Sequence, residues 1–244
     1  MQLLKFDHLD STNNYAKTLI KEGKANNGQI IYAVSQSAGR GQASNVWESE
    51  TGENLTFSMI IQPEGIEPKQ QFLISQAVSV GIVKYLKFLI NNAFIHIKWP
   101  NDIYVGMKKI AGILIEHTIQ GDQILYSVIG VGLNVNQTVF SKSVPNPTSL
   151  SIVNKAQYDL ETELDELTTM ITCELECLQF DDGEECRMEY LNHLLFLDEE
   201  REYTVRDKKI IGTIRGVNEF GLLQIQDKNG AILECGFKEI VYNL

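Results

Sequence analysis

The sequence is short of positive charge, and this shortage disfavours one large class of proteins. Its 244 residues include 21 lysines and arginines against 32 aspartates and glutamates, for a net charge of −11. A general nucleic-acid-binding protein needs a basic surface, so the charge balance argues against that function. It still leaves room for a local basic site inside an acidic shell.

Cysteine and histidine are scarce, with four residues of each type. Cys173 and Cys177 fall four apart in a predicted helix, but no further ligands follow at zinc spacing. No two histidines form a His-x-x-x-His pair. We therefore expect no zinc site, and we expect buried, reduced cysteines.

Signals for a membrane or for export are also missing. No stretch approaches the apolar length that a membrane span requires. Residues 1–7 lack the basic start and apolar run of a secretory signal. The hydrophobic fraction of 43% is ordinary for a packed globular protein. We predict a cytoplasmic protein with no membrane partner.

The hydrophobic pattern predicts an α+β fold with two domains. Strands are predicted at 29–36, 54–61, 94–98, 109–118 and 123–134, the last two as a hairpin, and helices at 12–22, 70–91, 159–180 and 184–196. From about residue 197 the chain consists of short alternating strands separated by turns such as Lys228-Asn229-Gly230, which favours a small SH3-like barrel. We place one domain at 1–196 and the second at 197–244.

Two cations and a carboxylate gather in the stretch that reads as strand, loop, strand. Lys98, Trp99, Pro100, Asn101 and Asp102 are consecutive, and Lys109 begins the run Lys-Ile-Ala-Gly-Ile-Leu. Pro100 turns the chain, so the polar residues after it lie at a strand end. Asp102 can ligate Mg²⁺ or orient an amine, and both lysines can pair with phosphate or carboxylate. The alternative is a polar turn with solvated lysines.

Three weaker patterns accompany this one. Gly39 and Gly41 flank Arg40, so this loop can bind an anion, and Trp47 after it can stack on a flat ring. The alternative is a surface turn with one arginine. The strand that contains Gly130 and Gly132 ends at Asn134, whose amide matches an adenine edge, but a strand that ends in a turn explains the pattern by itself. Ser11, Thr12 and Asn13 open a helix, either as a cap or as a ligand site as well.

In this order, the four patterns resemble the biotin protein ligases over nearly the whole chain. The resemblance implies a mixed-sheet catalytic domain of the biotin/lipoate ligase type followed by the small barrel. It implies that biotin and ATP react with Mg²⁺ to give biotinyl-5′-adenylate, and that biotin then passes to a lysine of a biotin carboxyl carrier protein. It also implies the short, monofunctional form without an N-terminal winged helix, no DNA partner, and the option of a homodimer.

The resemblance assigns roles residue by residue. Biotin would contact Ser11, Thr12, Asn13, Gln36, Gly39, Arg40, Gly41, Gln42, Lys109 and Gly112. The nucleotide would contact Arg40, Trp47, Lys98, Asn101, Lys109 and Asn134, and Mg²⁺ would be held by Asn101 and Asp102. Arg40, Lys98, Asp102 and Lys109 would be catalytic, and Gly132 would let backbone line the pocket with Gly112.

One departure from the family pattern and two rival functions remain. The loop commonly reads Gly-Arg-Gly-Arg with further basic residues, whereas here Gln42, Ala43, Ser44 and Asn45 follow Gly41. We therefore expect looser closure over the adenylate. The rivals are a lipoate- or octanoate-type ligase, which shares the fold and the adenylation logic, and a ligand-binding or assembly protein that keeps the fold without turnover.

Overall fold

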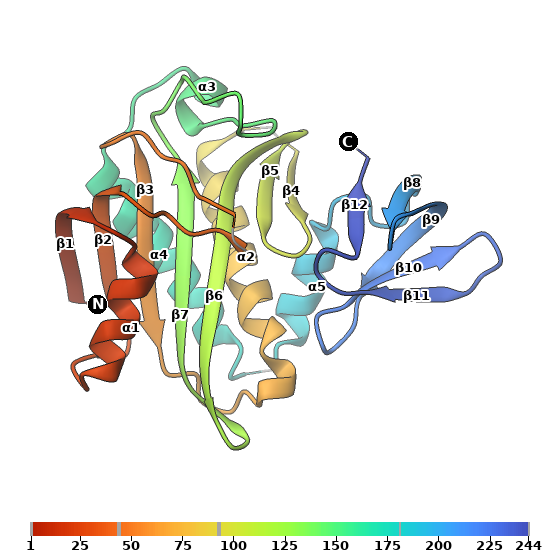
Figure 1. Cartoon of the computed structure of the whole chain (residues 1–244), viewed down its shortest axis with the longest axis horizontal. Coiled ribbons are helices and arrows are strands. Elements are labelled where there is room, and N and C mark those ends of the chain that lie inside the picture. The colour runs from red at the N-terminus through yellow and green to blue at the C-terminus, as the bar shows by residue number, and fades with distance from the viewer. Residues whose placement is uncertain (1, 43–44, 92–93, 181, 244) are drawn as a thin grey trace.

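A seven-stranded mixed sheet forms the centre of the molecule in the computed structural model, which describes residues 2–42, 45–91, 94–180 and 182–243 (Figure 1). The strand order is β1-β2-β3-β7-β6-β5-β4. The strands are β1 (Gln2–Leu9), β2 (Gln29–Gln36), β3 (Asn54–Ile61), β4 (Ile95–Lys98), β5 (Asp102–Val105), β6 (Lys108–Gln120) and β7 (Gln123–Asn134). Only β1 and β2 pair in parallel among these described strands.

Helices cover the two faces of this sheet unequally. Helix α1 (Thr12–Lys21) lies on one face, where Ala16 and Leu19 pack in a small buried cluster with Ile31 of β2 (Figure 1). Helices α2 (Phe72–Leu89), α4 (Leu160–Cys177) and α5 (Glu184–Asn192) lie on the other face, and α3 (Leu150–Asn154) and a 3-10 helix (Pro68–Gln70) are short connectors. The main core therefore lies between the sheet and α2.

The C-terminal segment forms a second, five-stranded antiparallel sheet beside the β4–β5 edge (Figure 1). Its order is β11-β10-β9-β8-β12, with strands β8 (Glu200–Val205), β9 (Lys208–Val217), β10 (Leu223–Asp227), β11 (Ile232–Cys235) and β12 (Ile240–Tyr242). We call residues 197–243 the C-terminal module. Buried residues on both sides of residue 197 belong to one core cluster, so the domain boundary there stays a prediction.

The predicted fold class, a mixed α+β sheet with a small C-terminal β unit, is confirmed. The predicted strands and longer helices all occur within a few residues of their expected ends. Five elements were missed: β1, β5, α3, β12 and the 3-10 helix. β1 is an exposed edge strand, and the others are only three to five residues long. Such elements show too little hydrophobic periodicity to be predicted from the sequence.

Two expectations about composition were wrong. Cys173 and Cys177 are exposed, because they lie on the outer side of α4, whereas Cys186 and Cys235 are buried. A segment long and apolar enough to span a membrane does exist at Pro68–Leu89. However, 67% of its most apolar window is buried inside the molecule, as expected for the central helix of a folded core.

Candidate active site

A cavity of about 360 Å³ opens where the strand ends of the central sheet meet the C-terminal module. It is in the size range of sites for small molecules. The residues that line it come from the start of α1, the loop after β2, the central strands and the C-terminal module: Ser11, Thr12, Asn13, Gln36, Arg40, Gly41, Gln42, Asn45, Val46, Trp47, Thr56, Phe57, Lys98, Trp99, Pro100, Asn101, Asp102, Lys109, Gly112, Ile113, Leu114, Gly130, Val131, Gly132, Phe237, Lys238, Ile240, Val241 and Tyr242.

Lys109 and Asp102 form an ion pair in the wall of this cavity. Their strands β5 and β6 are hydrogen-bonded neighbours, and Lys109 Nζ lies 2.6 Å from Asp102 Oδ1. The Lys109 ammonium also lies 5.6 Å from the ring centroid of Trp47, within reach of a cation–π contact. Lys109 is thus held at the cavity with its charge partly balanced.

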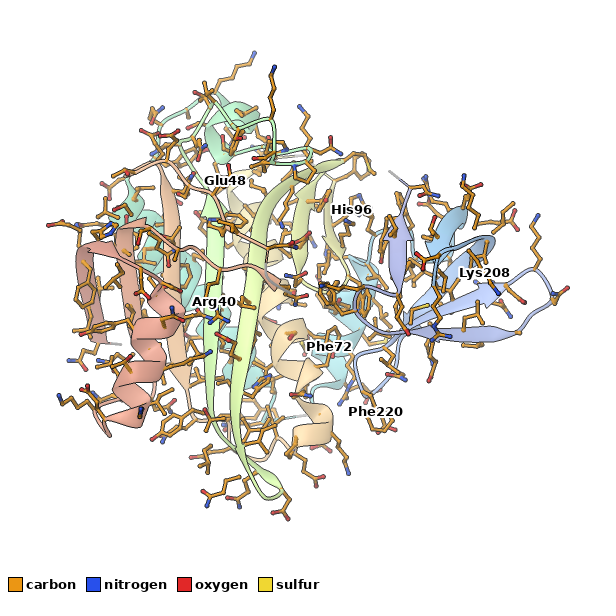
Figure 2. All side chains as sticks on the ribbon, in the orientation of Figure 1. Arg40, Glu48, Phe72, His96, Lys208 and Phe220 are labelled. Atoms are coloured by element: carbon orange, nitrogen blue, oxygen red, sulfur yellow. The ribbon has the colours of Figure 1, made fainter. Side chains whose placement is uncertain are left out.

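Arg40 forms a second charged cluster on the same side of the sheet. Its guanidinium contacts both oxygens of Glu116, in β6, at 3.1 Å each, and donates to Asn14 Oδ1 at 3.2 Å. Lys17 pairs with the same Glu116 carboxylate. Figure 2 shows the Arg40 side chain in front of β7 and β6. The loop that carries Arg40 is therefore tied to both α1 and the sheet.

Hydroxyl and amide groups occupy the end of the cavity nearest α1. Ser58 Oγ lies 2.7 Å from Thr12 Oγ1 and 2.6 Å from Asn13 Oδ1. The backbone N–H of Thr12 donates to Gln36 Oε1 at 2.8 Å. Ser11 is the N-cap residue of α1, but its side chain caps no backbone group, so its hydroxyl is not committed to the helix. These groups can recognise a polar ring.

Two glycines of strand β7, Gly130 and Gly132, allow the side chains of Asn13 and Trp47 to contact its backbone closely. A Cβ atom at Gly132 would lie 2.2 Å from Cε2 of Trp47, and one at Gly130 would lie 2.3 Å from Oδ1 of Asn13. Any larger residue would expel the indole or the amide from its place. The indole Nε1 of Trp47 is buried and has no partner among the described residues. Trp47 thus covers a backbone floor at the cavity.

The C-terminal module contacts the site at Lys98 and Trp99. Lys98 Nζ lies 5.5 Å from the ring centroid of Tyr104 and 5.3 Å from that of Tyr242 in β12. Trp99 donates its indole N–H to the backbone carbonyl of Gly221 at 3.0 Å. The pKa of the Lys98 ammonium is lowered, mainly because the group is buried. The negative charge of Asp102 raises this pKa in part, and the positive charge of Lys109 lowers it further.

The structure brings together nearly all of the residues that the sequence suggested. Ser11, Thr12, Asn13, Gln36, Arg40, Gly41, Gln42, Trp47, Lys98, Asn101, Asp102, Lys109, Gly112 and Gly132 share the cavity. Gly39 and Asn134 lie outside its lining in the described part of the chain, and the Asn134 amide is buried and donates to Thr148 O at 2.9 Å. Ala43 and Ser44 of the arginine-poor loop lie outside the described residues.

Several residues of the cavity wall were not predicted from the sequence. Thr56 and Phe57 project from β3, and Lys238 and Tyr242 come from the C-terminal module. A threonine within the apolar strand was the one available signal for Thr56. Lys238 and Tyr242 reach the site only because the module docks there, and local sequence carries no sign of that.

The Asn101–Asp102 pair offers oxygen atoms that suit Mg²⁺. Asn101 uses its Nδ2 to donate to Ile113 O at 2.7 Å, which leaves its Oδ1 available, and Asp102 has a second oxygen besides the one near Lys109. No cluster of three or more acidic, histidine or cysteine ligands occurs among the described residues. One or two protein oxygens completed by substrate phosphates and water are ordinary for Mg²⁺, so the donor set fits.

Comparison with known proteins places this chain in one class. The Biotin/lipoate A/B protein ligase family matches residues 5–134, which is more than half of the chain. The chain belongs to this family.

Individual relatives agree with that assignment. The chain is 36% identical over 138 residues to the bifunctional ligase/repressor BirA of Bacillus subtilis, a match that spans 55% of this chain and 41% of that protein. It is 29% identical to BirA of Escherichia coli over 224 residues, 89% of this chain and 67% of that one. The biotin protein ligase of Aquifex aeolicus, solved with biotin and ATP, superimposes with a TM-score of 0.80 at 25% identity, covering 98% of this chain and 97% of that one.

Proposed function

We propose that this protein activates biotin with ATP to biotinyl-5′-adenylate and transfers the biotin to a lysine of a biotin carboxyl carrier protein. The observation that carries the proposal is the shared cavity of Arg40, Lys98 and Lys109, with hydroxyl and amide groups at one end. Three cations facing one space suit two anionic substrates that must meet there. The biotin–ATP complex of the Aquifex relative supports the same choice of substrates.

The first step joins two anions. Biotin's carboxylate attacks the α-phosphorus of ATP, a C–O–P bond forms, and pyrophosphate leaves with the electron pair of the broken P–O bond. Two unit charges 4 Å apart repel by about 4 kcal/mol at an effective dielectric constant near 20. Lys109 and Arg40 offset this repulsion, and Lys98 binds the phosphates. Mg²⁺ at Asn101 and Asp102 would neutralise further phosphate charge when bound.

In the second step, the amine of a carrier lysine attacks the adenylate carbonyl and AMP leaves. With a reference pKa of about 10.4, roughly one lysine in 2,500 is neutral at pH 7. Asp102 lies in the cavity wall with its second carboxylate oxygen available to orient that amine or accept its proton. Trp47 and the glycine floor would shield the adenylate from water.

A direct assay distinguishes this function from its rivals. The protein is mixed with Mg²⁺-ATP and either biotin or lipoic acid, and exchange of labelled pyrophosphate into ATP is followed. Biotin-dependent exchange is the expected result. Exchange with lipoic acid alone would favour a lipoate-type ligase, and ligand binding without any exchange would favour a non-catalytic relative.

The partners and the cellular location of this protein remain predictions. A carrier protein as acceptor, the absence of a DNA or membrane partner, the option of a homodimer and a cytoplasmic location all come from the sequence. The match spans 41% of the Bacillus relative, a bifunctional ligase/repressor, so that protein's other properties are not transferred to this chain.

A further inference from the structure

Glu116 lies beside the cavity, and every described side chain that contacts its carboxylate belongs to the site or to α1. Asn13 Nδ2 donates to its Oε2 at 3.0 Å, Arg40 contacts both of its oxygens, and Lys17 pairs with Oε1. Burial alone would raise the pKa of Glu116, but the hydrogen bonds from Lys17 and Asn13 and the charges of Lys17 and Arg40 outweigh burial and lower it. Glu116 is therefore ionised and can only accept hydrogen bonds.

The ionised carboxylate fixes the orientation of the Asn13 amide. Nδ2 of Asn13 faces Glu116 and, at 3.3 Å, the backbone carbonyl of Leu114. Both groups accept only, so the amide must present its nitrogen to them and its oxygen to Ser58. That oxygen lies 2.6 Å from Ser58 Oγ and cannot donate, so the single hydroxyl proton of Ser58 points to Asn13.

The Ser58 hydroxyl in turn determines the direction of the hydrogen bond with Thr12. Ser58 Oγ also lies 2.7 Å from Thr12 Oγ1, and because the Ser58 proton is already committed, Thr12 must donate in this contact. Thr12 therefore keeps only lone pairs for a ligand. Thr56 is in the same state, since its hydroxyl donates to Ala33 O at 2.7 Å.

A donor complements these two acceptors. Gln36 accepts the Thr12 backbone N–H through its Oε1, which leaves its Nε2 group to donate elsewhere. Thr12, Thr56 and Gln36 all line the cavity. Two acceptors and a donor match the two N–H groups and the carbonyl of a cyclic urea. The dithiolane ring of lipoic acid carries neither an N–H nor a carbonyl group.

We propose that Glu116 is a positioning residue that sets the direction of the hydrogen-bond chain through Asn13, Ser58 and Thr12, and so makes this end of the cavity select a ureido ring. The inference rests on the proposed function and deepens it by naming the source of head-group selectivity. Glu116 acts through Asn13 and does not itself line the cavity among the described residues.

Two variants interrupt this series of hydrogen bonds at different points. In Glu116→Gln a single oxygen replaces two, so the side chain can no longer serve both Asn13 and the cations of Lys17 and Arg40. Ser58→Ala removes the central hydroxyl without touching Arg40. Glu174→Gln is the matched control, because Glu174 pairs with Lys84 between α4 and α2, and neither residue lines the cavity in the described part of the chain.

Binding of biotin alone, lipoic acid alone and ATP alone is measured for each variant by calorimetry. We expect Glu116→Gln and Ser58→Ala each to weaken biotin binding about 10- to 100-fold, the effect of a lost hydrogen bond to a buried polar group. ATP affinity should stay near that of the wild type in Ser58→Ala, and the preference for biotin over lipoic acid should narrow in both variants. Glu174→Gln should change none of these affinities.

Separate outcomes would overturn the inference and the proposed function. The inference is wrong if folded Glu116→Gln or Ser58→Ala binds biotin within about threefold of the wild type, or if biotin and ATP affinities fall together in Ser58→Ala. Wild-type protein that binds no biotin would instead contradict the proposed function. Should Glu116→Gln fail to fold, judged by its thermal unfolding, Ser58→Ala alone decides.

Discussion

At the scale of single residues, Lys109 and Asp102 form one ion pair but serve different steps. We predict that Lys109→Ala lowers biotin-dependent pyrophosphate exchange by at least about 100-fold, because a cation that opposes charge repulsion is lost. Asp102→Ala should lower carrier labelling by about 100-fold or more and exchange by less, because exchange loses one of two Mg²⁺ oxygens whereas labelling also loses the group that orients the amine. Exchange and labelling are assayed separately on each variant. Equal loss in both assays would argue against this division of roles.

Lys98 gives the site a specific pH dependence. Burial lowers the pKa of its ammonium, so it loses its proton at a lower pH than an ordinary lysine, whose pKa is about 10.4. Since the charged form binds phosphate, kcat/KM for ATP should fall at alkaline pH, beginning below that value. In Lys98→Arg the cation is permanent, so the fall should move to higher pH. Superimposable pH profiles for the two proteins would assign the fall to another group.

At the scale of elements, strand β7 can serve the site only because it lacks a side chain at Gly132. Gly132→Ala would place a methyl group 2.2 Å from Trp47 Cε2 and should weaken ATP binding about 5- to 100-fold by displacing the indole. The same change in a Trp47→Ala background should cost much less. Calorimetric titration of ATP into the four proteins forms a double-mutant cycle. Strict additivity would mean that the two residues do not act through this contact.

The sequence predicted the elements that carry the site better than the contacts between them. Residues 98–102 and Lys109 were expected at adjoining strand ends, and they are, because Pro100 turns the chain between β4 and β5. The role of Glu116 was not predictable, since its partners Lys17 and Arg40 are 99 and 76 residues away in sequence. Asn134 stays a predicted adenine contact, although it lies outside the cavity lining and its Nδ2 donates to Thr148 O.

At the scale of the whole molecule, the C-terminal module is attached directly to the catalytic strands. The Trp99 indole donates to Gly221 O, and Figure 2 shows Phe220 of the same turn on the side of the module that faces Phe72, with which it lines a smaller cavity. Tyr242 of the module lies against Lys98. Because buried residues on both sides of residue 197 form one cluster, we expect a single cooperative unfolding transition.

This attachment can be measured through a matched pair of substitutions. Trp99→Phe should lower the free energy of unfolding by about 1–3 kcal/mol more than Trp47→Phe does, because it leaves the Gly221 carbonyl without its donor. The Trp47 indole N–H has no partner among the described residues, so the same change there removes no hydrogen bond. Denaturant unfolding of both variants provides the comparison. Equal losses would show that the Trp99 hydrogen bond contributes little.

In the proposed function, one cavity carries out both activation and transfer. The decisive experiment incubates the protein with Mg²⁺-ATP, biotin and a biotin carboxyl carrier domain, and weighs the carrier by mass spectrometry. We expect a mass increase of one biotinyl group at a single lysine, lost when ATP is omitted or when Lys109 is replaced by alanine. A carrier whose mass stays unchanged, with biotin and ATP both bound, would contradict it.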